Sequence, residues 1–523
     1  MSILLDFKSR INFKSFRFAW LYRGALSRRR LREEITLIDA NYNSDSIKVP
    51  REDREVVVIF SSVALFTDHV ITEYALASEL EKAGASVIIV LCDRLMPICH
   101  AHDRYSCGVP KDNTSNLRTK NVCDSCQASR KEILKRSRFK VKSYSDYYQE
   151  DKRRPSKINI EEDSRAGVIR YLATSQLSEI DVSGLTMQYE NSASRVASVV
   201  QNLIDSEKPS LIIGHHGIYV PQGVINKVCE VNQVPFYSWH FGYRKSTLIF
   251  SRGNTYHKEL GAHFDLPTLL PAQRKKISDY LESRWKGSND WIHFNRNPKA
   301  LDKKDFNQKR IVFYSSVDWD AALHFDKNVY DNQFHFVDCL LRVASQFPLM
   351  KFIIRVHPAE STGNHPSHTR LDEYVKNNIV KNVEIIPADD TTSSYELAES
   401  CDIAIVYNTK LGVELTSMGI PTIVAGESWV KGRGFTWDIN KPSDLEHYLS
   451  NAETLKMTDE MKKDALSFAY YFFFKRCINV PELRSISDKF HIKFEASSSI
   501  HGSGLSHIAH SLIAQSSVIV NLD

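Results

Sequence analysis

The sequence predicts an α/β protein built from two domains. Short apolar runs of strand length alternate with helical patterns from residue 55, and the same alternation starts again at residue 310. At 523 residues the chain is too long for one ordinary hydrophobic core. Apolar residues make up 42% of the chain and charged residues 25%, which is typical of a folded globular protein.

The first domain is predicted to begin with a βαβ unit. A strand at residues 56–60 leads through a polar loop to a helical pattern that ends at Gly84, and a second strand follows at residues 86–91. Gly84 suits the C-terminus of the helix, because glycine readily adopts the left-handed conformation found there. The unit is Rossmann-like, but it lacks a Gly-x-Gly-x-x-Gly motif, so NAD or FAD binding is not supported.

A cysteine-rich loop is expected at residues 92–126. Cys123 and Cys126 form a Cys-x-x-Cys pair that can supply two thiolates to a tetrahedral zinc ion, and Cys99 and Cys107 could complete a structural site. Because the spacing is irregular, ordinary reduced cysteines and a redox role remain alternatives.

Histidines follow the next strands of the first domain. After a mainly helical stretch at residues 142–209, a strand from Ser210 ends near His215 and His216, and a further strand from Pro235 runs to His240. Adjacent histidines at a strand tip suit a general base or an acceptor contact, and a structural histidine is the alternative for each.

The second domain carries polar residues at the ends of three predicted strands, which are expected at residues 351–356, 401–407 and 421–425. Ligands of parallel α/β sheets lie beyond the carboxyl ends of the strands, where helix N-termini direct their N–H groups outward. The strand at residues 351–356 is ended by Pro358, and strand alternation places Arg355 and His357 on the same face at its tip. These groups predict a site for a phosphate-bearing ligand, and ordinary turn chemistry is the alternative for each loop.

The predicted ligand-binding residues come from these loops and from the first strand exit of the domain: Arg355, His357, Pro358, Asn408, Thr409, Glu414, Lys431, Gly432, Arg433, Gly434, Ser315 and Ser316. Glu414 could hold a ribose or sugar hydroxyl, or it could be an acid favoured by the helix dipole. Asp318 and Asp320 are expected to cap a helix rather than to hold a divalent ion.

Four segments of the second domain carry a resemblance to a known family: residues 354–360, 407–414, 419–421 and 432–436. They resemble the donor domain of capsule and surface-polysaccharide glycosyltransferases of the GT-B type, which include relatives of bacterial Kdo transferases. The cysteine pattern after residue 91 also looks like the first domain of these enzymes, which favours an architectural role for the cysteines.

The resemblance implies two facing Rossmann-like domains with a nucleotide-activated sugar held mainly by the second. It assigns contacts with the donor nucleotide and its phosphates to His357, Asn408 and Thr409. No catalytic metal is expected. The implied division is a basic and aromatic extension (1–54), a first domain (55–285), a second domain (305–455) and C-terminal helices that cross back, followed by a tail (456–523).

The predicted function is therefore transfer of a sugar, of hexosyl or Kdo/sialic type, to a growing capsular or other surface glycan. Cationic groups and backbone N–H groups would stabilise the leaving nucleotide phosphate. An inverting mechanism needs a base from the first domain, for which Asp68, His69 and His216 are candidates. The alternatives are a nucleotide-sugar epimerase of the same fold and a non-catalytic subunit of a polysaccharide-assembly complex.

Composition also limits the partners and the location. The net charge of +5 is small for this length, so nucleic-acid binding is not expected. No apolar run approaches the roughly 20 residues that span a bilayer, and the N-terminus lacks a secretory apolar region, so a cytoplasmic location is expected. Basic and aromatic residues between Phe7 and Arg32 favour either contact with an anionic inner-membrane surface, near a lipid-linked acceptor or export machinery, or a helix packed on the first domain.

Overall fold

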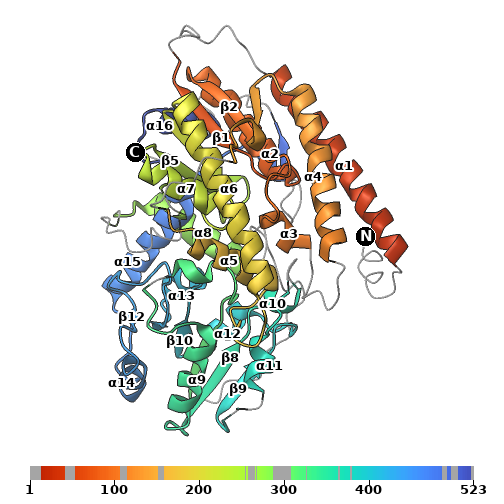
Figure 1. Cartoon of the computed structure of the whole chain (residues 1–523). Helices are drawn as coiled ribbons and strands as arrows, with labels where there is room; N and C mark the ends of the chain where they lie inside the picture. The colour runs from red at the N-terminus through yellow and green to blue at the C-terminus, as the bar shows by residue number, and fades with distance from the viewer. Residues whose placement is uncertain are drawn as a thin grey trace.

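The computed structural model describes residues 13–41, 54–105, 115–150, 158–253, 255–256, 266, 268–286, 308–325, 327–362, 366–376, 378, 380–485, 492–495 and 504–519, without the side chains of residues 13–23 and 103–121. Figure 1 shows two α/β units, with the N-terminal one above the other. The predicted fold class, two Rossmann-like domains of the GT-B type, is confirmed. Residues 287–307, at the junction of the two predicted domains, lie outside the described residues.

The first domain is organised around a seven-stranded sheet in the order β13-β6-β5-β4-β1-β2-β3. Five neighbouring strands are parallel, namely β5 (Phe236–Phe241), β4 (Leu211–His215), β1 (Val56–Phe60), β2 (Ser86–Leu91) and β3 (Lys140–Ser143). β6 (Thr247–Arg252) pairs antiparallel with β5, and β13 (Ile478–Asn479) pairs antiparallel with β6. The sequence did not predict β6, because a short apolar run does not distinguish a strand from a buried helix.

Both faces of this sheet are covered by helices. Side chains of β1 alternate between two cores, since Val57 and Ile59 face one and Val58 and Phe60 face the other. The first core includes residues of α1 (Phe13–Ala40), α2 (Thr67–Lys82), α4 (Ser115–Arg136) and α16 (Gly504–Ile513). The second includes residues of α5 (Glu161–Leu172), α6 (Ser183–Glu207) and α7 (Gln222–Val231), and the short helix α3 (His100–Tyr105) lies between α4 and α5 (Figure 1).

The second domain contains a fully parallel sheet in the order β12-β11-β10-β7-β8-β9. Its strands are β7 (Lys309–Tyr314), β8 (Met350–Arg355), β9 (Val383–Ile386), β10 (Ile403–Val406), β11 (Thr422–Val424) and β12 (Trp437–Asp438). Its helices are α9 (Gln333–Ala344), α10 (Ala359–Thr362), α11 (Leu371–Val375), α12 (Ser394–Glu399), α13 (Leu411–Ser417) and α14 (Asp444–Ser450). All strands therefore point the same way, so that their carboxyl ends share one edge.

Two segments connect the domains, namely α8 (Pro271–Trp285) and the C-terminal helices expected to cross back. α8 is placed in the first domain by a boundary at residue 285, yet it packs with α15 (Asp459–Tyr470) in a core of the second domain. After α15 and a π-helical turn (Tyr471–Arg476), the chain returns to the first domain through β13, the hairpin β14 (Leu483–Ser485) and β15 (Ile492–Phe494), and α16, which packs on α2. The C-terminal segment thus ties the second domain to the first.

The N-terminal helix α1 lies beside α4 and also packs on α2 (Figure 1). Leu31, Ile35 and Ile38 are buried in the core of the first domain. Phe7 and Lys8 lie outside the described residues, as do the side chains up to Tyr22, so lipid contact by this segment stays a prediction. No helix within the described ranges is both long and apolar enough to cross a bilayer.

Candidate active site between the two sheets

Histidines gather at the carboxyl edge of the first sheet. His215 is the last residue of β4, His216 follows it, and His240 lies one residue before the end of β5. His69, near the start of α2, brings its Nε2 to 3.1 Å from the Nε2 of His215. The ring centroids of His216 and His240 lie 4.6 Å apart, and those of His215 and His216 also lie 4.6 Å apart. Parallel pairing of β4 with β5 fixes this proximity, since His215 stands opposite Trp239.

Two of these histidines, His215 and His240, lie in surroundings that disfavour the protonated form. Burial lowers the pKa of His215 well below its ordinary value, and the neighbouring His69 and His216 lower it further. Burial also lowers the pKa of His240. The His240 Nδ1 lies 2.7 Å from the carbonyl oxygen of Phe241, so this nitrogen carries the proton and donates it, leaving Nε2 as an acceptor. Among the described residues, one set of three or more His, Cys, Asp or Glu side chains has ligand atoms that all lie within 4.8 Å of one another, and it consists of His215, His216 and His240.

The three predicted base candidates do not gather at one point. His69 and His216 belong to the histidine group. The Asp68 carboxylate instead accepts hydrogen bonds from Arg30 of α1 and from the Ile492 N–H (2.8 Å), so it ties the N-terminal helix to β15. These two contacts give Asp68 a structural role, because they hold α1 and β15 together.

At the carboxyl edge of the second sheet, His357 follows β8. Its backbone N–H donates to Ser315 Oγ (2.8 Å), and its Nδ1 accepts from the Ala359 N–H (3.1 Å). The neutral ring therefore carries its proton on Nε2. Burial, together with the nearby charges of Arg355 and Lys410, lowers the pKa of His357 to about 4. His357 is thus a neutral hydrogen-bond donor at ordinary pH.

Arg355 is placed differently from the prediction that it grips phosphate beside His357. It is 1% exposed, and its guanidinium donates to the carbonyl oxygens of Pro387 (2.6 Å), Asp390 (3.2 Å) and Thr392 (3.2 Å). The side chain therefore organises the loop between β9 and α12. Pro358 begins the short turn into α10, and the Pro358 carbonyl lies 3.4 Å from the Ser361 hydroxyl.

The remaining loop residues of the second domain bond mainly to one another. Asn408 Oδ1 accepts from the Glu427 N–H (2.7 Å), and a Cβ on Gly426 would lie 2.2 Å from that oxygen, so glycine is required there. Thr409 Oγ1 accepts from the Leu411 N–H (3.3 Å) at the start of α13.

Ser315 and Ser316 form the exit of β7. Ser315 supports His357 as described, and the Ser316 N–H donates to Gln333 Oε1 (2.6 Å) at the start of α9. Both serines therefore hold loops in position at the same edge of the sheet.

Glu414 forms a buried ion pair rather than an open contact. Its Oε1 lies 2.9 Å from Arg284 of α8, and the two side chains are 1% and 2% exposed. Tyr395 donates its hydroxyl to the other carboxylate oxygen, and Lys410 lies 3.5 Å away. These partners lower the pKa of Glu414 against the effect of burial. A sugar hydroxyl would have to compete with them, so a role in holding α8 against α13 accounts for the residue.

In the loop that holds Gly432 and Gly434, the charged side chains also contact other residues of the protein. Lys431 Nζ donates to the Ile439 carbonyl (3.2 Å), and the Arg433 guanidinium lies 4.8 Å from the Phe468 ring centroid. Gly432 and Gly434 have positive φ angles of 74° and 84°, which require glycine in this turn. The Gly432 N–H donates to an Asp438 carboxylate oxygen (2.7 Å).

Side chains from both domains meet beside the histidine group. Asp320 of the second domain accepts from Arg170 (2.8 Å) and from the hydroxyl of Tyr219 (3.2 Å) in the first. The Asp318 carboxylate accepts from the Ser175 N–H (2.9 Å). The prediction that Asp318 and Asp320 cap a helix is therefore wrong, because their loop lies against α5 and both carboxylates reach across to the first domain.

The charge of Asp320 acts on histidines of both domains. Its negative charge raises the pKa of His240 and the pKa of His357, against the lowering effect of burial. Aromatic contacts cross the same boundary, since the ring of Trp429 stacks on that of Tyr256 at 5.3 Å. The carboxyl edges of the two sheets therefore face a common region.

The predicted cysteine-rich loop is largely helical, since His100 begins α3 and Cys123 and Cys126 lie on α4. It borders this region, because the His100 ring centroid lies 6.1 Å from that of His216 and 5.6 Å from that of Tyr219. Cys99 Sγ is 3.5 Å from Nδ1 of His102, and Cys123 Sγ is 3.7 Å from Nε2 of the same ring. Burial raises the pKa of the Cys126 thiol. Cys107 lies outside the described residues, so the predicted zinc site stays a prediction.

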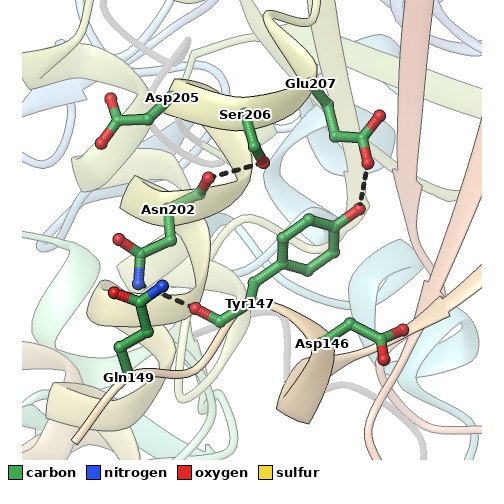
Figure 2. A pocket seen from close by; sticks show the side chains of 7 residues that line it. All are labelled: Asp146, Tyr147, Gln149, Asn202, Asp205, Ser206 and Glu207. Atoms are coloured by element: carbon green, nitrogen blue, oxygen red, sulfur yellow. Dashed lines mark hydrogen bonds between the residues drawn. The ribbon is translucent and has the colours of Figure 1, made fainter.

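A separate hollow of about 360 Å³ lies beside η5 (Tyr144–Asp146), which follows the edge strand β3, and the C-terminal part of α6 (Figure 2). In it the Tyr147 hydroxyl donates to Glu207 (2.8 Å), and Asn202 donates to the Tyr147 carbonyl (2.8 Å). None of the predicted site residues lines this hollow.

A family model matches the part of the chain that contains most of the second domain. Residues 284–470 match the family model described as capsule polysaccharide biosynthesis protein. The match confirms the resemblance drawn from the sequence and covers a little over a third of the chain. No curated protein matches the chain significantly.

Solved structures resemble the chain at low identity. The Thermosulfurimonas dismutans KpsC beta Kdo 2,4 transferase is 12% identical over 54% of this chain and 84% of its own, with a TM-score of 0.36. The beta Kdo 2,7 transferase of the same KpsC is 15% identical over 61% and 89%, with a TM-score of 0.33. The UDP-GlcNAc 2-epimerase from Neisseria meningitidis is 10% identical over 79% and 97%, with a TM-score of 0.22.

Sequence reasoning missed several residues of the candidate site. Tyr219 and Arg170 were not selected, because only folding brings them to Asp320. Glu73 of α2 was also missed, although an acidic residue on an apolar helical face was a usable signal. It is 3% exposed, accepts hydrogen bonds from Ser61 and from Trp239 Nε1 (3.1 Å), and burial raises its pKa to about 8.

Proposed function

We propose that the protein is a glycosyltransferase that moves a sugar from a nucleotide-activated donor to a growing capsular or related surface glycan. The family match over residues 284–470 supports a role in capsule polysaccharide biosynthesis. The two-domain arrangement supports a reaction between two bound substrates, because parallel sheets bind ligands at their carboxyl edges and both edges face one region.

The observation that carries the proposal is the contact of Asp320 with Arg170 and Tyr219 of the first domain, which brings the carboxyl edges of the two sheets together. His240 belongs to the first sheet and His357 to the second, and the charge of one carboxylate acts on both. Perturbed histidines that converge from two domains favour a catalytic site over a surface contact.

His357 is the proposed donor-phosphate contact. The Ala359 N–H donates to Nδ1, so Nε2 carries the proton and is the ring nitrogen proposed to donate to a phosphate oxygen. Such a donor becomes more favourable as negative charge grows on the departing nucleotide, which is the condition for lowering the barrier. Asn408 and Thr409 order the neighbouring loop and the start of α13, so their proposed role includes backbone contacts to the same nucleotide.

A base for the acceptor hydroxyl is proposed from the first domain. His69 and His216 belong to the histidine group, whereas the carboxylate of Asp68 is engaged by Arg30 and Ile492. Neutral imidazoles are able to accept a proton, which supports a histidine in this role.

The function is tested by nucleotide release from a panel of nucleotide sugars, chosen first by thermal shift. Release that requires a glycan acceptor is the expected result. Interconversion of the free donor without acceptor would identify an epimerase. Binding without turnover on any donor and acceptor pair would identify a non-catalytic subunit.

Peripheral membrane contact is a separate proposal that rests on the basic N-terminal segment. Sedimentation with anionic vesicles at low and high salt tests it. Salt screening weakens vesicle binding only if the basic side chains face the lipid. Deletion of residues 1–23 leaves Leu31 and Ile35 in the core and should reduce the salt-sensitive part, since the arginines at 28–30 and 32 remain. Unchanged sedimentation after the deletion would rule the contact out.

A further inference from the structure

The histidine group of the first domain has the composition of a metal site. His215, His216 and His240 offer three ring nitrogens that lie within 4.8 Å of one another. Three imidazoles bound to a tetrahedral ion at about 2.1 Å would lie roughly 3.4 Å apart, so small side-chain rotations suffice to close the set. His215 and His240 belong to adjacent paired strands, which gives the site a rigid base.

We propose that His215, His216 and His240 together bind one divalent transition-metal ion of the zinc class. This inference concerns the histidine group from which the proposed function draws His216 as a candidate base, and it differs from the expectation that no catalytic metal takes part. Imidazole ligands suit zinc, copper, iron and nickel, whereas magnesium and calcium prefer oxygen.

Hydrogen bonding around His240 already has the form found at metal ligands. Its Nδ1–H donates to the Phe241 carbonyl (2.7 Å), which fixes the ring and directs the lone pair to Nε2. Ligating histidines usually donate their other ring N–H to a carbonyl or carboxylate in this way. The contact therefore selects the tautomer that coordination needs.

His215 supplies a second, independent observation. The residue is 6% exposed, and its Nδ1 has no hydrogen-bond partner among the described residues. A buried ring nitrogen without a partner is costly in a folded protein, and a bound ion would satisfy a lone pair of this kind. Burial also lowers the pKa of His215, and the neutral imidazole is the form that coordinates a metal.

Three histidine ligands would leave one position of a tetrahedral ion open. Structural zinc sites are closed by four protein ligands, whereas sites with three protein ligands keep a water or substrate oxygen in the fourth position. The position of the set at the carboxyl edge of β4 and β5 gives that ligand access from the region between the domains. A metal-bound nitrogen of His216 has no free lone pair, so this nitrogen could not also act as the general base.

Cobalt titration of the full-length protein tests the site directly, without any sugar substrate. The affinity tag is removed, bound metal is stripped with a chelator, and Co²⁺ is added while its visible absorption is recorded. We expect one equivalent to bind without a thiolate-to-cobalt charge-transfer band. A thiolate band would arise from the cysteine-rich loop, so the Cys123→Ser variant is titrated in parallel and should retain the histidine-bound cobalt.

Two substitutions remove ligands with little disturbance of the fold. His216 has a φ of 70°, a conformation that asparagine tolerates, so His216→Asn preserves the backbone. His240→Gln keeps a polar side chain of similar length. Each should weaken Co²⁺ binding at least tenfold, while His335→Gln on the exposed start of α9 should leave it unchanged.

X-ray absorption of the Cys123→Ser protein loaded with one Zn²⁺ gives a readout that needs no histidine variant. Nitrogen ligands at about 2.0–2.1 Å with imidazole scattering are expected, whereas sulfur would appear near 2.3 Å. Absence of Co²⁺ binding by the folded wild-type protein would overturn the proposal. So would binding that both histidine variants retain, or zinc held by sulfur in the Cys123→Ser protein.

Discussion

The carboxyl edges of the two sheets use their polar residues in opposite ways. In the second domain, Arg355 and Lys431 bond to nearby carbonyl oxygens, and Glu414 is buried against Arg284. In the first domain, by contrast, His215 and its neighbouring histidines contact one another. The edge of the second sheet was predicted to bind a ligand through its charged residues. Several of those residues instead bond to other groups of the protein.

This difference shows how the chemistry of a side chain decides its use at a strand end. A buried guanidinium or ionised carboxylate must be paired, because an isolated charge in a low-dielectric region is costly. A buried carboxyl without such a partner keeps its proton, as the raised pKa of Glu73 indicates. An imidazolium can lose its proton and become neutral near ordinary pH. Burial lowers the pKa of both His215 and His357 and so favours the neutral ring. Neutral histidines can therefore remain at an edge where charged groups have to find partners.

The largest expected effect concerns the buried Arg284–Glu414 pair. Removing one partner leaves an uncompensated buried charge, so Arg284→Ala or Glu414→Ala should destabilise the second domain by about 3–5 kcal/mol. Urea unfolding followed by intrinsic fluorescence measures the change. The double variant Arg284→Met, Glu414→Leu should lose much less than the sum of the two single variants. Losses below about 1 kcal/mol in both single variants would show that the pair is not the structural element inferred for this edge.

The next effect distinguishes His357 from its neighbour Arg355. His357→Ala should lower turnover by roughly a hundredfold or more, equivalent to about 2.7–4 kcal/mol, if its Nε2–H stabilises the leaving phosphate. Its thermal stability should change little. Arg355→Ala should instead lower stability, because three carbonyl oxygens lose their donor. Full specific activity in a folded His357→Ala protein would contradict the assignment of His357 as a donor-phosphate contact.

A pH-dependent effect tests the buried carboxyl beneath the histidines. Burial raises the pKa of Glu73 from 4.5 to about 8. The folded state therefore binds more protons than the unfolded state between these values, so the contribution of Glu73 to stability is full below pH 4.5 and is lost as the pH rises through 8. Wild-type protein should lose stability between pH 6 and pH 8 relative to Glu73→Gln, as measured by urea midpoints at each pH. Parallel pH profiles for the two proteins would contradict the burial of a protonated Glu73.

The smallest effect concerns the carboxylate that links the two edges. Asp320 and Arg170 have side chains that are 55% and 19% exposed, so Asp320→Asn should change stability by less than about 1 kcal/mol. Loss of the negative charge should lower the pKa of His240 and of His357 further, because the carboxylate raises both. NMR titration of labelled histidines measures this. Unchanged pKa values for both rings would contradict an electrostatic effect of Asp320 on the histidines of the two domains.

The sequence by itself determined the fold class and most of the strands. Continuous apolar runs with polar exits predicted β1, β2, β7 and β8, because buried parallel strands must be apolar along their whole length. The same runs fixed which residues lie at the carboxyl edges, since a strand end is a local property. The positions of His216 and His357 at strand ends could therefore be inferred from the amino-acid sequence alone.

Only the tertiary structure decided which of these residues are already engaged. Arg284 meets Glu414 across 130 positions of the chain, and Arg170 meets Asp320 across 150. Hydrogen-bond partners at such separations depend on how helices and loops pack, and no local pattern encodes them. For the same reason the sequence placed Asp68 beside His69 as a candidate base, while folding directed its carboxylate toward Arg30 and β15.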